Sequence, residues 1–257
     1  MQKEFAKNVI HILKNDPTIV GLAGAGSWVT NEIDQWSDLD LVIVTKDNLN
    51  ADKSLMVEYA SRFGNLLSAF TGEHVGEKRL LICLYDEPLL HVDIKFVTLD
   101  EFCDRIEDPV ILLDNDEALQ KIISTTKAEF PTPDYQWIED RFWTWLHYGL
   151  TKIGRGEYFE ALDFMAYLRM VIFGPLLHIK NKNLPRGVRR VETTLAHDDF
   201  KSLESTLSFN NKESLLNALS NAVQLYKTLR QDLFNNKISY NKAEDSVLRY
   251  MKDLRKC

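Results

Sequence analysis

The residues best suited to chemistry lie in the stretch 24–44, GAGSWVTNEIDQWSDLDLVIV. Asp38 and Asp40 stand two positions apart at the start of an apolar run, so on a strand their side chains leave the same face. Two carboxylates held this close repel each other unless a cation lies between them. Mg2+ prefers hard oxygen ligands and is commonly bound by one or two carboxylates together with substrate phosphates. The pair therefore predicts a magnesium site.

The turn at Gly26-Ser27 precedes these aspartates and is suited to a phosphate. Glycine lets a ligand approach the backbone closely, and N–H groups together with a hydroxyl can donate to phosphate oxygens. Taken alone, an Asp-x-Asp pair or a Gly-Ser turn is more often a solvated turn or a helix cap, and the chain has no GxxxxGK[ST] motif. The order of strand, Gly-Ser, spacer, Ser-Asp-x-Asp and strand favours transfer at a phosphorus atom.

A third acid, Asp93, lies in the run 89–97, which predicts a strand with apolar and polar faces. His91 and Lys95 share its polar face, either as partners of Asp93 or as solvated side chains. If this strand neighbours the one that begins at Asp40, the three acids converge on one site.

A sheet is needed to hold these acids. The run 39–44 has little polar alternation, as is typical of a strand covered on both faces. Pattern and punctuation predict helices over 3–14, 52–70 and 99–106, strands over 19–23, 39–44, 80–85 and 89–97, and an edge strand over 109–113.

The second half has a different character. Prolines and threonines at 124–134 predict a connector, and helical periodicity follows at 137–153, 157–180, 211–233 and 241–254, with no strand predicted after 135. We therefore expect an α+β chain, with a mixed β-sheet core followed by an all-α helical bundle, and domains at 1–130 and 131–257.

The composition limits the classes of binding partner that we expect. A net charge of -7 over 257 residues argues against nucleic acid; it is compatible with a cationic small molecule, or with an acidic surface that only aids solubility. Three cysteines without CxxC spacing predict neither a disulfide framework nor a zinc site. No signal peptide is recognisable, and no stretch approaches the apolar length of a membrane span, so we expect a cytoplasmic protein without a membrane partner.

Together these motifs resemble the nucleotidyltransferase superfamily, which shares the DNA polymerase β catalytic core. The stretch 34–40, DQWSDLD, is similar to aminoglycoside adenylyltransferases, notably streptomycin 6-adenylyltransferases. Residues 141–145, 152–157 and Ala161 are similar to the helical domain of those enzymes. The residues that match the superfamily motifs in turn are Gly26, Ser27, Asp38, Asp40 and Asp93.

The resemblance implies a magnesium-dependent enzyme that moves a nucleoside monophosphate, AMP from ATP or that of another NTP, to a hydroxyl of a small molecule and releases pyrophosphate. Aminoglycosides are among the candidate acceptors. Asp38 and Asp40 would hold Mg2+, and Asp93 would complete the metal site or act as general base. The backbone of Gly26 and the Ser27 hydroxyl would hold the phosphates.

The resemblance also implies that a lysine of the helical domain reaches the triphosphate, and Lys152 is the candidate. A surface lysine near a helix end is an equal alternative, and Arg155 is a competing choice. A cationic substrate could meet Trp143 with Glu139 or Glu157, although such an aromatic stripe is normally core.

Two other interpretations stay open. One is a nucleotidyltransferase that acts on a protein or another acceptor. The other is a non-catalytic nucleotide-binding or partner-binding module, which would not need clustered carboxylates. No feature of the sequence addresses the oligomeric state.

Overall fold

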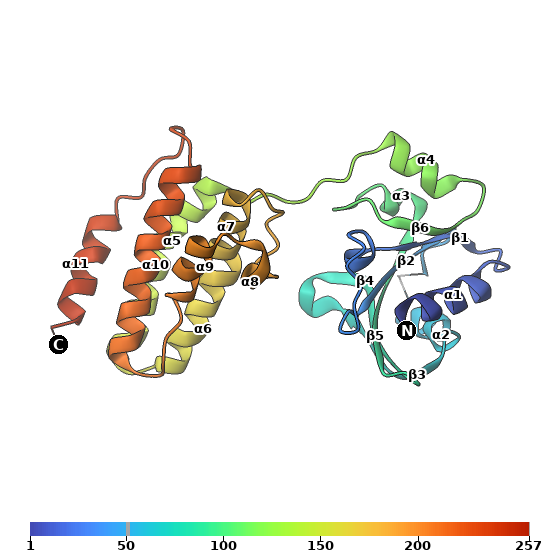
Figure 1. Ribbon diagram of the computed structural model, residues 1–257, viewed down its shortest axis with the longest axis horizontal. Helices are drawn as coiled ribbons and strands as arrows, with labels where there is room; N and C mark the ends of the chain where they lie inside the picture. The colour runs from blue at the N-terminus through green and yellow to red at the C-terminus, as the bar shows by residue number, and fades with distance from the viewer. Residues whose placement is uncertain (50–51, 257) are drawn as a thin grey trace. The chain divides into compact units, whose positions relative to one another are not determined.

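The computed structural model describes residues 1–49 and 52–256 of the chain (Figure 1). The chain divides into two compact units, Met1–Phe130 and Pro131–Cys257. The first contains a mixed sheet with helices, and the described part of the second contains helices without strands. The predicted α+β class, with a sheet core followed by a helical region, is confirmed.

The sheet of the first unit has the strand order β3-β4-β5-β2-β1-β6. β2 and β5 run parallel, whereas the other neighbouring strands pair antiparallel. The strands are β1 (Ile19–Gly24), β2 (Leu39–Thr45), β3 (Asn65–Gly72), β4 (Glu77–Asp86), β5 (Leu90–Thr98) and β6 (Val110–Asp114). The predicted edge strand is thus β6, which pairs only with β1 among the described strands.

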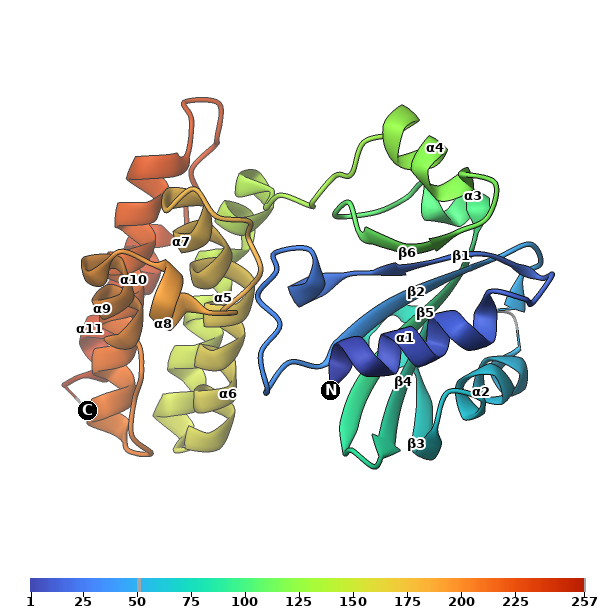
Figure 2. The ribbon, with the colours of Figure 1, turned by 45° about the vertical axis from the view of Figure 1, so that its right-hand side comes forward.

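Helices cover both faces of this sheet (Figure 2). α1 and α2 pack on one face, and α3 and α4 pack on the other. Along β2, Leu41 and Ile43 belong to the first core and Val44 to the second, so this strand is buried on both faces as predicted. The helices are α1 (Gln2–Leu13), α2 (Lys53–Ser61), α3 (Leu99–Phe102) and α4 (Ala118–Thr125).

The prediction of one helix over 52–70 is wrong in its second half. α2 ends at Ser61, and residues 65–72 form β3, which pairs antiparallel with β4. Leu66 and Ala69 still pack on the core, but from a strand. A short apolar run fits either period, and here the unpaired edge of β4 decides in favour of a strand. The helix α4 was not predicted, and the helix predicted over 99–106 ends at Phe102.

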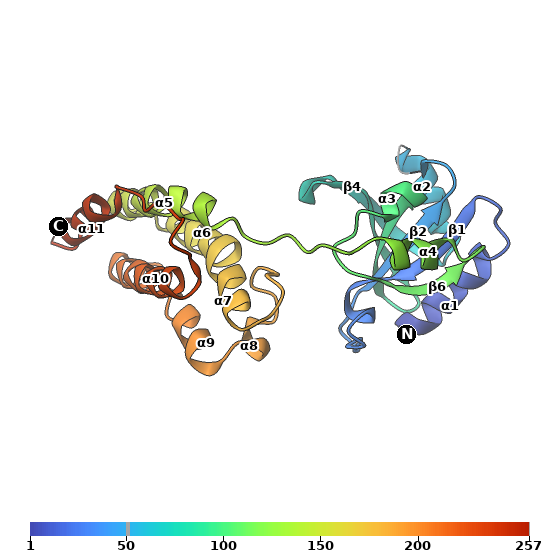
Figure 3. The ribbon, with the colours of Figure 1, turned by 90° about the horizontal axis from the view of Figure 1, so that it is seen from above.

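The second unit is a helical bundle in which α10 lies beside α5 and α6 (Figure 3). Its core is one continuous apolar cluster drawn from helices α5 to α11. Two short helices, α8 and α9, were not predicted. The helices are α5 (Tyr135–Arg155), α6 (Tyr158–Leu168), α7 (Gly174–Lys180), α8 (Val191–Thr194), α9 (His197–Glu204), α10 (Lys212–Leu233) and α11 (Glu244–Leu254).

A π-helical segment, Arg169–Phe173, joins α6 and α7 into one helical run. Among the described residues, this run of 23 residues, Tyr158–Lys180, is the one that is long and apolar enough to cross a membrane. Glu160, Asp163 and Arg169 interrupt this run, so it is not an uninterrupted apolar stretch, and the absence of a membrane partner stays a prediction. Of its apolar window, 56% is buried inside the protein, and the core helix of a bundle shows the same combination of length, composition and burial.

Candidate active site

The Gly-Ser turn follows β1 directly and forms a short 3-10 turn, Gly26–Trp28. Gly26 has φ +59°, and a Cβ added there would lie 2.0 Å from Asp40 Oδ2. Both the backbone conformation and the lack of space therefore require glycine. The Ala25 N–H donates to the Asp40 carbonyl at 3.0 Å, and the Ser27 side chain is buried. The turn is thus fixed against Asp40, the second residue of β2.

The two strands that carry the predicted acids, β2 and β5, are neighbours in the sheet. In the parallel β2–β5 ladder, Asp40 is the register partner of Asp93, so both side chains leave the same face of the sheet. Asp38 immediately precedes β2. Burial raises the pKa of the Asp93 carboxyl; His91 acts against this, and the charge of Asp38 adds to it. The two central strands of the sheet therefore place Asp40 beside Asp93, and Asp38 is close enough for its charge to act on Asp93.

The polar neighbours of Asp93 separate into two roles. His91 Nε2 lies 2.9 Å from Asp93 Oδ1, and the His91 side chain is half exposed. Lys95 instead pairs with Glu77 at 2.9 Å, and Glu77 also accepts two hydrogen bonds from the Arg79 guanidinium. His91 is thus the partner of Asp93, whereas Lys95 belongs to a separate ion-pair network.

A braced loop leads into Asp38. The buried Gln2 side chain donates to the carbonyls of Asp34 and Ser37 at 2.9 and 2.8 Å. The Ser37 hydroxyl donates to Asp34 Oδ1 at 3.0 Å. These bonds fix the approach to the Asp-x-Asp pair and leave the Trp36 ring exposed.

The acids fit Mg2+ by chemistry rather than as a finished cage. Asp38, Asp40 and Asp93 offer only hard carboxylate oxygens, which suit this ion. Over residues 1–49 and 52–256, no group of three or more His, Cys, Asp or Glu side chains is arranged to hold a metal ion. Because Mg2+ commonly takes only one or two carboxylates plus substrate phosphates, the metal role of these acids remains a prediction.

One acid beside the turn was not predicted. The Gly26 N–H donates to Glu107 Oε1 at 2.7 Å. Glu107 follows α3 and precedes β6, and β6 pairs with β1 so that Val110 is the partner of Gly24. No local spacing could have indicated this contact, because it depends on the position of β6 next to β1.

In the helical unit, Lys152 is engaged by carboxylates. Its Nζ lies 2.9 Å from both Glu157 and Glu160 and 5.0 Å from the centre of the Tyr148 ring. The hydrogen bond to Glu157, then that to Glu160, raises the pKa of Lys152. Arg155 lies 3.9 Å from Glu157. The contact of Lys152 with a triphosphate stays a prediction.

Two residues considered for a cationic substrate are core residues. Glu139 and Trp143 are both fully buried. Glu139 accepts from Tyr226 at 2.5 Å and pairs with Arg230 at 3.2 Å, while the Asn241 N–H donates to it at 3.0 Å. The hypothesis that either residue faces a substrate is wrong, because Trp143 packs in the core of the bundle and Glu139 is surrounded by protein partners.

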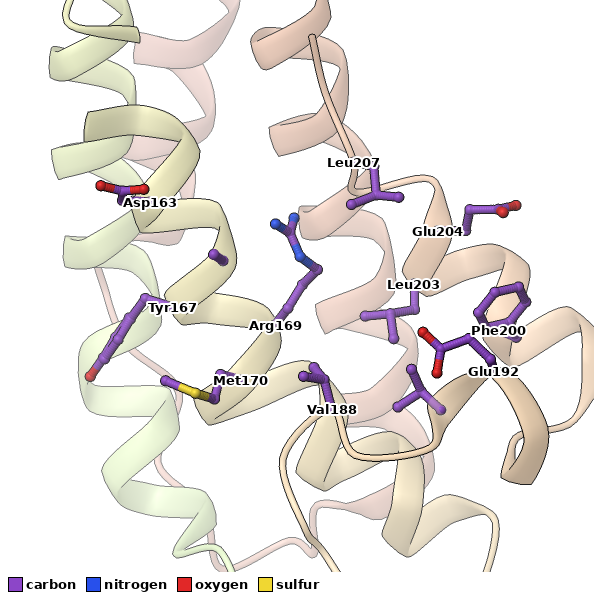
Figure 4. A pocket seen from close by; sticks show the side chains of 12 residues that line it. Asp163, Tyr167, Arg169, Met170, Val188, Glu192, Phe200, Leu203, Glu204 and Leu207 are labelled. Carbon is purple, nitrogen blue, oxygen red and sulfur yellow. The ribbon is translucent and has the colours of Figure 1, made fainter. Parts of the chain in front are cut away.

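The helical unit has its own cavity, of about 710 Å3 (Figure 4). Its walls are largely apolar, and it also carries three exposed carboxylates. Arg169 lies in it and donates to the Thr206 carbonyl at 3.0 Å; burial lowers the pKa of its guanidinium. This volume is in the usual range for small-molecule sites. The lining residues are Asp163, Ala166, Tyr167, Arg169, Met170, Val188, Val191, Glu192, Phe200, Leu203, Glu204 and Leu207.

A mixed sheet that carries a Gly-Ser turn and paired aspartates, followed by a helical bundle, is the arrangement expected of a nucleotidyltransferase. Residues 1–254 match the family model described as streptomycin adenylyltransferase. The chain therefore belongs to the streptomycin adenylyltransferase family and is a nucleotidyltransferase.

Among solved structures, the chain is similar to an aminoglycoside 6-adenyltransferase from Bacillus subtilis, with 16% identity over 99% of this chain and 98% of that one and a TM-score of 0.40. It is also similar to a nucleotidyltransferase-like protein from Exiguobacterium sibiricum 255-15 (12% identity, 91% and 79% covered, TM-score 0.38). A third is the spectinomycin adenyltransferase AAD(9) from Enterococcus faecialis with ATP and spectinomycin (11% identity, 100% of both chains covered, TM-score 0.32). No curated protein matches in sequence. The family assignment rests on the family model alone.

Proposed function

We propose that the protein transfers AMP from ATP to a hydroxyl of a small molecule and releases pyrophosphate, with Mg2+ as cofactor. The observation that carries this proposal is the register pairing of Asp40 with Asp93 beside the Gly26 turn. In this proposal, residues 1–130 form the catalytic domain and residues 131–257 bind the acceptor.

The roles follow from the positions of the side chains. Asp38 and Asp40 hold Mg2+, which when bound neutralises charge on the triphosphate oxygens. The Gly26 backbone and Ser27 bind phosphate oxygens, and Lys152 adds a cation from the helical domain.

Asp93 accepts the proton of the acceptor hydroxyl. The acceptor oxygen forms a bond to the α-phosphorus as the bond to the pyrophosphate oxygen breaks. Burial favours the protonated form of Asp93, and this suits a carboxylate that must take up a proton.

The cavity of the helical unit is the proposed acceptor site. Its apolar walls would cover the rings of an acceptor, and Asp163, Glu192 and Glu204 would attract ammonium groups. Asp163 also borders a second, smaller hollow that contains Trp145 and Tyr148. These features favour a cationic small molecule, and the family name makes aminoglycosides the first class to examine.

The test is pyrophosphate release from each NTP with Mg2+, across aminoglycosides and other polyols. We expect ATP-dependent release with one class of acceptor. The variant D163N should raise KM for that acceptor and leave KM for ATP unchanged. Silence across the panel, with ATP binding intact, would contradict a small-molecule acceptor and favour a protein acceptor.

A further inference from the structure

The proposed phosphate turn already holds an anion. The Gly26 N–H donates to the Glu107 carboxylate at 2.7 Å, which is the short distance of a charge-assisted hydrogen bond. The loop that carries Glu107 is anchored at its end by the pairing of Val110 with Gly24. Glu107 therefore reaches the turn from the loop before β6, the strand on the far side of β1 from β2.

The turn has little freedom to present this N–H elsewhere. Asp40 Oδ2 lies against the Cα of Gly26 on one side, and the Ala25 N–H is bonded to the Asp40 carbonyl. A carboxylate oxygen and a phosphate oxygen are the same kind of acceptor for a backbone N–H. One N–H cannot make a full hydrogen bond to both at once.

We propose that Glu107 is an internal competitor for the triphosphate: it occupies the Gly26 N–H in the free enzyme and must leave before a phosphate oxygen binds there. This inference rests on the proposed function, since it takes the Gly26 turn to be the phosphate site. It also gives Glu107 a role after the reaction. Its return to Gly26 displaces pyrophosphate and so assists product release.

Charge adds to this competition. Glu107 places a further carboxylate at the Gly26 turn, which the Asp40 carboxylate also borders. This charge repels anions that bind without Mg2+, so pyrophosphate without Mg2+ is the most sensitive probe.

The experiment is titration calorimetry of ATP and of pyrophosphate, each with and without Mg2+, against the full chain and three variants. We expect E107A to bind pyrophosphate about 10-fold more tightly, because the competing state is removed. E107Q keeps an acceptor oxygen without the charge, so its affinity should lie between the two. D104N is the matched control: it removes one exposed carboxylate from the same loop and should leave both affinities unchanged.

Product inhibition gives a readout that a merely structural role would not move. With E107A, pyrophosphate should inhibit turnover at a lower concentration than with the wild type, while D104N behaves as the wild type. Circular dichroism and thermal unfolding confirm folding, and E107Q, which is nearly isosteric, keeps the test open if E107A is unstable.

Three results would overturn the inference. Weaker binding by E107A, with E107Q equal to the wild type, would make Glu107 a clamp that positions the turn. Unchanged affinities in both variants would show that Gly26 does not take phosphate. Wild-type protein that binds neither ATP nor pyrophosphate would refute the proposed function and the inference with it.

Discussion

Asp40 of β2 and Asp93 of β5 are register partners on parallel neighbouring strands. Residues so paired leave the same face of a sheet, and the ladder fixes their separation before any ligand arrives. In the proposed reaction, such a preorganised pair costs no reorganisation energy. This pairing is the basis for assigning one acid to the nucleotide and the other to the acceptor.

The first prediction concerns Asp93. The substitution Asp93→Asn should lower turnover at least about 100-fold, as expected when a general base is removed. ATP binding should be retained, because the Gly26 turn and Asp40 are untouched. Steady-state rates and calorimetry measure the two effects. Near-normal turnover would contradict the assignment, and E58Q, an exposed acid on α2, controls for loss of one negative charge.

The second prediction compares two glycines at positive φ. Gly26→Ala should abolish ATP binding, because the new Cβ would collide with the Asp40 carboxylate. Gly76→Ala is the matched control: its φ is +79°, but nothing lies within 4 Å of the added Cβ. It should cost about 1 kcal/mol of unfolding free energy and leave binding intact. Equal effects of the two variants on ATP affinity would show that the turn is not a binding element.

These positions also show what the sequence could predict. The strands that carry Asp40 and Asp93 followed from residue spacing and alternation, because each signal is local, while the roles of these acids stay predictions. Glu107 could not be predicted, since it meets Gly26 only through the pairing of β6 with β1.

The local sequence pattern led to wrong predictions where tertiary contacts determine the structure. Residues 65–72 carry apolar side chains that suit a helix, yet β4 offers an edge to pair with and a strand forms. Glu139 carries a charge that suggests exposure, yet Tyr226 and Arg230 satisfy it inside the bundle. In both cases the partner lies too far along the chain for periodicity to reveal it.

The third prediction concerns that buried carboxylate. Glu139→Gln removes the charge that Arg230 and Tyr226 face, so it should lower the unfolding free energy by about 3 kcal/mol. Tyr226→Phe should cost about 1 kcal/mol, because one hydrogen bond is lost. Urea unfolding measures both. The exposed E213Q should stay within about 0.5 kcal/mol of the wild type. A change equally small in E139Q would show that the network contributes little.

The fourth prediction is a pH dependence. The hydrogen bond from Arg79, with help from Lys95, lowers the pKa of Glu77 from 4.5 to about 2, although burial opposes it. A carboxyl with a depressed folded pKa stabilises the protein above its unfolded pKa and loses this effect as the pH falls from about 4.5 to about 2. Because solvent reaches this pair, we expect only about 1 kcal/mol of stabilisation at pH 7.

Urea unfolding of E77Q and the wild type at pH 7 and pH 3 measures this dependence. The stability difference should be larger at pH 7 and should shrink at pH 3. A difference that stays constant between the two pH values would contradict the linkage.

The central claim is tested most directly by the mass of the acceptor after incubation with MgATP and the purified protein. The wild type should convert an aminoglycoside or another polyol to an adduct that carries one AMP, with pyrophosphate formed in equal amount. D40N should form none. An adduct formed equally well by D40N, or no adduct on any acceptor although ATP binds, would contradict adenylyl transfer at the Asp40–Asp93 site.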